Sequence, residues 1–112
     1  MATLLPKDSE NNVIPAVRLK PDGAHTINAT ATSARNAVAF AADTQVISFY
    51  ATVPVYMKFG GASVSATSAD HYFPAGVYYD FSIGGGKVSH YTHVAVLRVG
   101  SSDGVVYISE KE

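Results

Sequence analysis

Apolar and polar residues alternate strictly over much of the second half of this chain. Residues 53–59 carry an apolar side chain at every second position, and residues 77–83 repeat the pattern. A period of two is typical of a strand with one face on a core and the other in water. The residues predicted to face the core are Val53, Val55, Met57, Phe59, Val77, Tyr79, Phe81 and Ile83. Gly60-Gly61 and Pro74-Ala75-Gly76 supply the corners after and between these strands.

Further short runs rich in β-branched and aromatic residues predict the rest of the fold. The additional strands are expected at residues 25–32, 45–52, 63–67, 90–99 and 105–109. Residues 101–104 are expected to form a hairpin turn, and residues 110–112 a solvated tail. The segment Ser33–Ala42 fits either a short helix or a strand over 36–40. Seven to eight short strands between turn residues predict an all-β protein, a single antiparallel β-sandwich or jelly roll.

Residues 1–24 have a different pattern from the rest of the chain. Pro6, Pro15 and Pro21 interrupt it, and Pro21-Asp22-Gly23 has the composition of a turn. We therefore expect residues 1–24 to form an extended N-terminal arm and residues 25–112 to form the sandwich domain. A proline-broken arm is often held by a partner. The apolar residues expected to contact a neighbouring subunit are Leu4, Leu5, Val13, Ile14 and Val17.

Composition narrows the class of partner. The chain has 112 residues, enough for one domain, and a charged fraction of 15%, below the usual value of about 25%. Its net charge of −1 supplies neither the basic stripe of a nucleic-acid protein nor a polybasic lipid-binding segment. No apolar run is long enough for a membrane span, and the first residues lack the apolar centre of a signal peptide. We expect synthesis in the cytoplasm, with no nucleic-acid or membrane partner.

Candidate catalytic and metal-binding residues are sparse. The chain has no cysteine, so thiol chemistry and thiolate metal sites are excluded. A metal site could be imagined from His71, His90 and His93 with Asp70. Strand geometry argues against it, because residues three apart on a strand, such as His90 and His93, point to opposite faces. We expect structural histidines bonded to neighbouring carbonyls, no catalytic residues, no metal and no cofactor. A cupin-like metal enzyme ranks last among the hypotheses.

One corner combines polar and aromatic side chains. Asp70, His71 and Tyr72 precede Pro74-Ala75-Gly76, and they form the candidate surface-binding corner. Outward tyrosines can stack on sugars or pack in a protein interface. A carbohydrate-binding module is therefore an alternative function. The simpler interpretation of Asp70 is a turn carboxylate that accepts hydrogen bonds from nearby backbone N–H groups.

Several of these strand ends and turns together resemble small β-sandwich virion proteins of tailed bacteriophages. Those proteins show a strand ending in V-x-[VIM]-[KR]-F-G, a V-x-A-T strand, a D-x-x-[FL]-P-A-G corner and a closing H-[IV]-A-V-L…G-x-V-Y-[IV]-S pair, often preceded by S-x-R-[NS]. The matching segments here are Val55–Gly60, Val64–Thr67, Asp70–Gly76, His93–Leu97 with Gly104–Ser109, and Ser33–Asn36. The similarity covers roughly residues 25–110 and leaves the arm outside.

The resemblance implies a non-enzymatic structural role on the phage particle. The first expectation is a capsid decoration or cement protein that works as a homo-oligomer and contacts other virion subunits such as the major capsid protein. A head–tail connector or tail-associated protein is the alternative within the same class. The expected location is the virion, after synthesis in the host bacterial cytoplasm. Arms of this kind bind by strand addition or by lying across a neighbour, and repetition strengthens weak contacts.

Overall fold

The computed structural model describes residues 5–13, 16–85 and 88–112. These residues form eight β-strands in two antiparallel sheets of four strands, which confirms the predicted all-β sandwich. Within the same ranges, no helix is long and apolar enough to cross a lipid bilayer. The strands are β1 (Leu19–Ala29), β2 (Ala34–Arg35), β3 (Val46–Ala51), β4 (Val55–Gly60), β5 (His71–Phe73), β6 (Tyr78–Ser82), β7 (His93–Arg98) and β8 (Gly104–Lys111).

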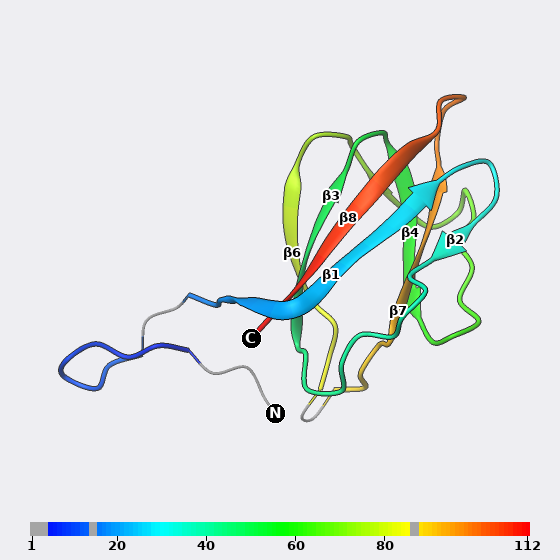
Figure 1. The fold of residues 1–112 in the computed structure, drawn as a ribbon. Helices are drawn as coiled ribbons and strands as arrows, with labels where there is room; N and C mark the ends of the chain where they lie inside the picture. Colours follow the sequence, from blue (N-terminus) through cyan, green and yellow to red (C-terminus); the bar gives the residue numbers. More distant parts are fainter. Residues whose placement is uncertain (1–4, 14–15, 86–87) are drawn as a thin grey trace.

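The strand order identifies the sandwich as a jelly roll. One sheet has the order β1-β8-β3-β6 and the other has the order β2-β7-β4-β5 (Figure 1). The first strand pairs with the last, the second with the seventh, the third with the sixth, and the fourth with the fifth, all antiparallel. These nested pairs are what a long hairpin forms when it is rolled into two layers. Strands distant in sequence are therefore neighbours, and loops gather at the two ends.

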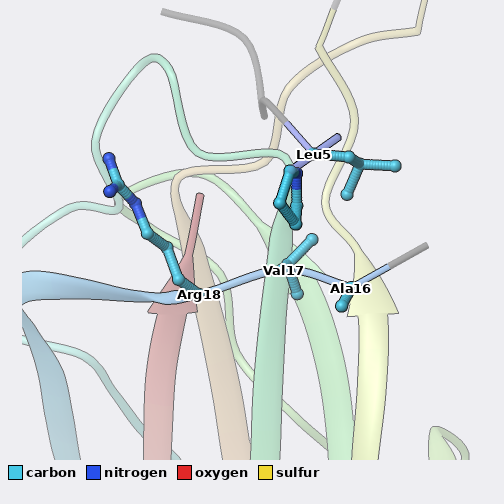
Figure 2. A pocket seen from close by; sticks show the side chains of 5 residues that line it. Leu5, Ala16, Val17 and Arg18 are labelled. Carbon is cyan, nitrogen blue, oxygen red and sulfur yellow. The ribbon is translucent and has the colours of Figure 1, made fainter. Parts of the chain in front are cut away.

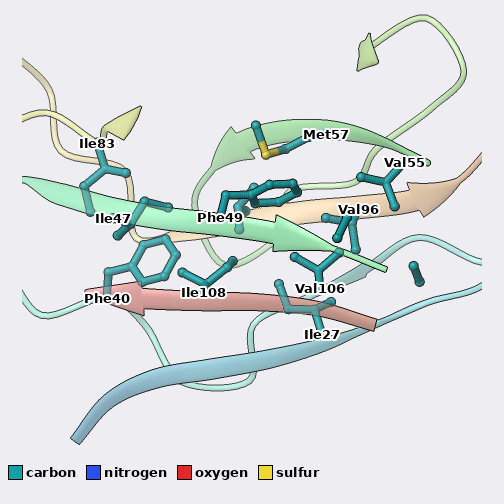
Figure 3. Close-up of a cluster of buried hydrophobic side chains, with 13 residues drawn as sticks. Ile27, Phe40, Ile47, Phe49, Val55, Met57, Ile83, Val96, Val106 and Ile108 are labelled. Atoms are coloured by element: carbon teal, nitrogen blue, oxygen red, sulfur yellow. The ribbon is translucent and has the colours of Figure 1, made fainter. Parts of the chain in front are cut away.

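The core lies between the two sheets, where the inward side chains of both layers meet (Figure 3). Phe49 at its centre is fully buried and contacts the rings of Phe73 and Phe81 edge-on or tilted, at 5.7 and 6.1 Å. Burying one such side chain contributes about 1.5–3 kcal/mol. The fully or almost fully buried apolar residues include Ile27, Ile47, Phe49, Val55, Met57, Ile83, Val94, Val96, Val106 and Ile108.

The alternation predicted the two faces of β4 correctly. Val55 and Met57 are buried, and Val53 and Phe59 pack against the core from its margin. The run over residues 77–83 behaves in the same way except at its start, where Val77 is 42% exposed. This residue precedes β6, so no partner strand holds its side chain over the core.

Neither interpretation of Ser33–Ala42 is correct. Pairing is limited to β2, and residues 36–42 form neither strand nor helix. The reason is the buried side chain of Asn36, whose Nδ2 donates to the carbonyls of Val38 and Thr92 and whose Oδ1 accepts from the N–H of Val94. The amide thus satisfies backbone groups that a ladder would otherwise pair. The expected strand at residues 63–67 is also wrong, because those residues form a loop.

The turn at residues 101–104 does not close a hairpin. It carries the chain from β7 in one sheet to β8 in the other, so the predicted pairing of these strands is wrong. Pro21-Asp22-Gly23 does not end a segment either, because β1 runs through it from Leu19. The register shifts between Leu19 and Ala24, and Asp22 has a φ of 62°. These residues form an irregularity of the bulge type in an edge strand.

Candidate functional site

The described part of the N-terminal arm, residues 5–13 and 16–18, lies beyond the N-terminal end of β1, and residues 7–13 lie away from both sheets (Figure 1). Its root is fixed, because the backbone of Arg18 pairs with that of Glu112 through bonds of 3.0 and 2.8 Å. Of the predicted contact residues, Leu5 and Val17 are half-buried and Val13 is 56% exposed. Leu4 and Ile14 lie outside the described residues. The arm thus offers apolar surface that its own domain does not cover.

A turn shapes the outer part of the arm. Asp8 Oδ1 accepts hydrogen bonds from the N–H groups of Glu10 and Asn12, both at 2.9 Å, and Lys7 bridges to Val13. Asn11 takes a φ of 65°, which its short polar side chain tolerates. The backbone N–H of Asn12 lowers the pKa of Asp8 below its usual value. The turn therefore gives the outer part of the arm a defined hairpin shape.

An open hollow of about 420 Å³ lies between residues 5–6 and residues 16–18 of the arm. Figure 2 shows Leu5 opposite Ala16 and Val17, with Arg18 to one side. The lining is mostly apolar and comes from the arm alone: Leu5, Pro6, Ala16, Val17 and Arg18. Among the described residues of this lining, Arg18 has the one titratable side chain.

The predicted corner at Asp70–Tyr72 lies at the start of β5, at the edge of the second sheet. Asp70 Oδ2 accepts from the N–H of Thr67 at 2.7 Å, which confirms its interpretation as a turn carboxylate. His71 is exposed, and Tyr72 is 55% exposed beside Tyr56, with ring centroids 6.3 Å apart. The three residues are adjacent in sequence, but the Asp70 carboxylate already accepts a hydrogen bond within its own turn.

The candidate histidines are dispersed: His71 is exposed, His90 is bonded to a carbonyl as expected, and the partner of His93 is a hydroxyl. His90 Nε2 donates to the carbonyl oxygen of Thr44 at 2.7 Å, as expected for a structural histidine. His93 is buried, and its Nδ1 lies 2.8 Å from the hydroxyl of Thr92. Burial, together with the positive charge of Arg35, lowers the pKa of His93. Across residues 5–13, 16–85 and 88–112, no three His, Cys, Asp or Glu side chains gather as metal ligands would.

The most concentrated polar cluster was not predicted. Glu110 was expected in a solvated tail, but it belongs to β8 and is 4% exposed. Its Oε1 accepts from the Thr44 hydroxyl at 2.5 Å and from the Ala41 N–H at 2.9 Å. Its Oε2 accepts from His25 Nε2 at 2.7 Å, and the His25 ring meets the ring of Phe40 edge-on. The alternation along the sequence does indicate this buried position, since a period of two places residue 110 on the inward face of β8.

The cluster is built to hold an ionised carboxylate in a buried position. Burial acts to raise the pKa of Glu110, but the hydrogen bonds from Thr44, His25 and the Ala41 N–H outweigh it and lower the pKa. Both carboxylate oxygens accept hydrogen bonds from other segments of the fold. Gly23 allows β1 to pass close by, because a Cβ there would lie 2.9 Å from Glu110 Cβ. Through Ala41 and Thr44 the cluster connects the loop before β3 to β8, and through His25 it connects β8 to β1.

Comparisons of this chain with family models, with curated proteins and with solved structures found no match.

Proposed function

We propose that this chain is a non-enzymatic structural subunit of a tailed-bacteriophage particle, a capsid decoration or cement protein that works in many copies. The observation that carries the proposal is the arm, which stands clear of a well-packed jelly roll and exposes apolar residues such as Val13, at 56%. An extension of this kind stabilises a neighbour by adding a strand or lying across it. Many weak contacts become strong when symmetry repeats them.

The sequence resemblance supports the same class. The Ser33–Asn36 element, which contributed to it, has a defined role in the fold: Ser33 Oγ accepts from the Ala66 N–H at 2.8 Å, and Asn36 holds β7. The jelly roll itself is compatible with capsid proteins, lectins and cupins, so it supports the proposal by analogy alone.

Deletion of residues 1–16 tests the role of the arm. The cut leaves Arg18 in place, so the backbone pair with Glu112 and all eight strands remain. We expect the truncated protein to keep the melting temperature of the full chain but to lose binding to capsids that lack this subunit. A Val13→Asp variant should weaken binding in the same direction, whereas Val38→Ser, at an exposed apolar position on the body, should not.

Two outcomes separate the parts of the proposal. Full occupancy of capsids by the truncated protein would show that the arm is not the docking element. Absence of the chain from purified particles by mass spectrometry would exclude the virion role as a whole. If the chain is present in the particles, immunogold labelling will distinguish a decorated head from the head–tail region.

A further inference from the structure

Three tyrosines form a row across the outer face of the first sheet. Tyr50 on β3 is in register with Tyr78 on β6 on one side and with Tyr107 on β8 on the other. All three point away from the core, since their strand neighbours Phe49, Ile108 and the other inward residues are buried. Neighbouring strands lie about 4.8 Å apart, so the row spans about 10 Å.

The two outer tyrosines of the row are exposed, and Tyr78 lies on the edge strand β6. Tyr78 is 73% exposed and Tyr107 is 49% exposed, while Tyr50 between them is half-buried. The rings of Tyr50 and Tyr78 are 5.0 Å apart and inclined at 39°, so they form a tilted pair. Cross-strand aromatic pairs do stabilise sheets. That effect does not account for a Tyr78 side chain left mostly in water.

Polar groups border the row on one side. The next register position along these strands holds Asp80, Ser48 and Ser109. Asp80 forms an ion pair with Lys111 on the same face, at 2.7 Å, and 61% of its side chain remains exposed. Ser48 is buried, so the accessible polar groups beside the aromatic strip are the half-buried Ser109 and the Asp80–Lys111 ion pair, whose charges balance.

We propose that this tyrosine row is a binding site for a neutral oligosaccharide of pyranose rings. A pyranose ring has an apolar face of C–H groups and a rim of hydroxyls, which match the aromatic strip and the polar strip respectively. A single-stranded nucleic acid also stacks on aromatics, but it needs a positively charged groove, and Asp80 at this border opposes one. The site is separate from the arm and does not depend on the particle role.

The row also replaces the corner at Asp70–Tyr72 as the sugar site. Tyr72 lies on β5, in the other sheet, and its neighbour Asp70 already bonds the Thr67 N–H. Tyr72 is nevertheless a tyrosine of comparable exposure, at 55%. It therefore serves as a matched control for loss of an exposed aromatic ring.

The test is a titration of the full-length protein with cellohexaose, maltohexaose and chitohexaose, followed by amide chemical shifts in NMR spectra. We expect saturable shifts in β3, β6 and β8 with at least one of the three sugars. Tyr78→Ala and Tyr107→Ala should each weaken binding about tenfold. Tyr78→Phe should retain most of the affinity because the ring remains, and Tyr72→Ala should have no effect.

Equal melting temperatures of the variants would show that the fold is intact. The proposal is wrong if none of the three sugars gives saturable shifts in these strands, or if the shifts map to β5 and depend on Tyr72. It is also wrong if the sugars fail and Tyr78→Ala abolishes capsid binding, because the row would then be a protein contact.

Discussion

Replacing Glu110 with alanine would remove an acceptor that three buried or half-buried donors share. In the folded protein the carboxylate accepts from the Thr44 hydroxyl at 2.5 Å, the Ala41 N–H at 2.9 Å and the His25 ring at 2.7 Å. The backbone of β8 would keep its pairing with β1 and β3. Because Glu110 is only 4% exposed, water cannot readily take the place of the carboxylate. The change therefore isolates the polar cluster from the rest of the sheet.

The expected loss is large relative to the stability of a small domain. Each buried donor left without an acceptor costs about 1–3 kcal/mol. Losses within one network are not additive, so we expect a decrease of about 4 kcal/mol in the free energy of unfolding. Domains of this size have about 5–15 kcal/mol in total.

Urea unfolding at pH 7, followed by circular dichroism, measures the effect. Glu110→Gln keeps one oxygen for Thr44 and Ala41, so it should cost only about 1–2 kcal/mol. Glu112→Ala removes an ion pair with Arg18, whose side chain is 82% exposed, and should cost less than about 1 kcal/mol. The account of the cluster is refuted if Glu110→Ala costs no more than Glu112→Ala.

The same cluster predicts how stability depends on pH. The pKa of Glu110 in the folded protein is lowered from its ordinary value of 4.5, so folding favours the ionised carboxylate. This contribution is present above the ordinary pKa and is lost as the pH falls through the folded pKa. The gap in stability between the native chain and Glu110→Ala should therefore narrow below pH 4.5. An unchanged gap at about pH 3 would contradict this mechanism.

Three further substitutions have clear expectations. Phe49→Ala removes a fully buried ring and should cost about 3–5 kcal/mol in urea unfolding; a loss below about 1 kcal/mol would mean that the core collapses to fill the space. Gly84→Ala should lower the free energy of unfolding by more than about 2 kcal/mol, because φ is +90° and a Cβ would lie 1.9 Å from the Ser89 carbonyl oxygen. Gly61→Ala, which meets nothing within 4 Å, is its control, and equal losses would count against the argument. Asp70→Ala should cost about 1 kcal/mol through the lost bond to the Thr67 N–H, and an unchanged melting curve would show that the bond is dispensable.

The positions of most strands followed from local pattern. The alternation over residues 53–59 predicted β4 and its buried face, and the β-forming residues before it predicted β3. These inferences succeed because side chains alternate across any extended strand, whatever it pairs with. The arm's exposed Val13 likewise follows from a segment that proline keeps out of helices and that no sheet covers.

The charge of Glu110 led to the wrong prediction that this residue lies in a solvated tail. Val106 and Ile108 precede Glu110 at alternate positions, so the alternation does place Glu110 on the inward face of β8. A carboxylate is tolerated there only where hydrogen-bond donors surround it. Those donors come from His25, Ala41 and Thr44, remote in sequence. The tyrosine row depends in the same way on the register of three strands.

Sequence pattern thus accounts for most of the strands, their inward faces and the all-β class. Sheet membership, register and the polar cluster required the folded chain. The turn at residues 101–104 is the clearest case, since its residues suit a hairpin yet it joins two sheets. A strand's periodicity is a property of its own backbone, whereas its partner is whichever distant segment satisfies its N–H and C=O groups while both bury their apolar faces.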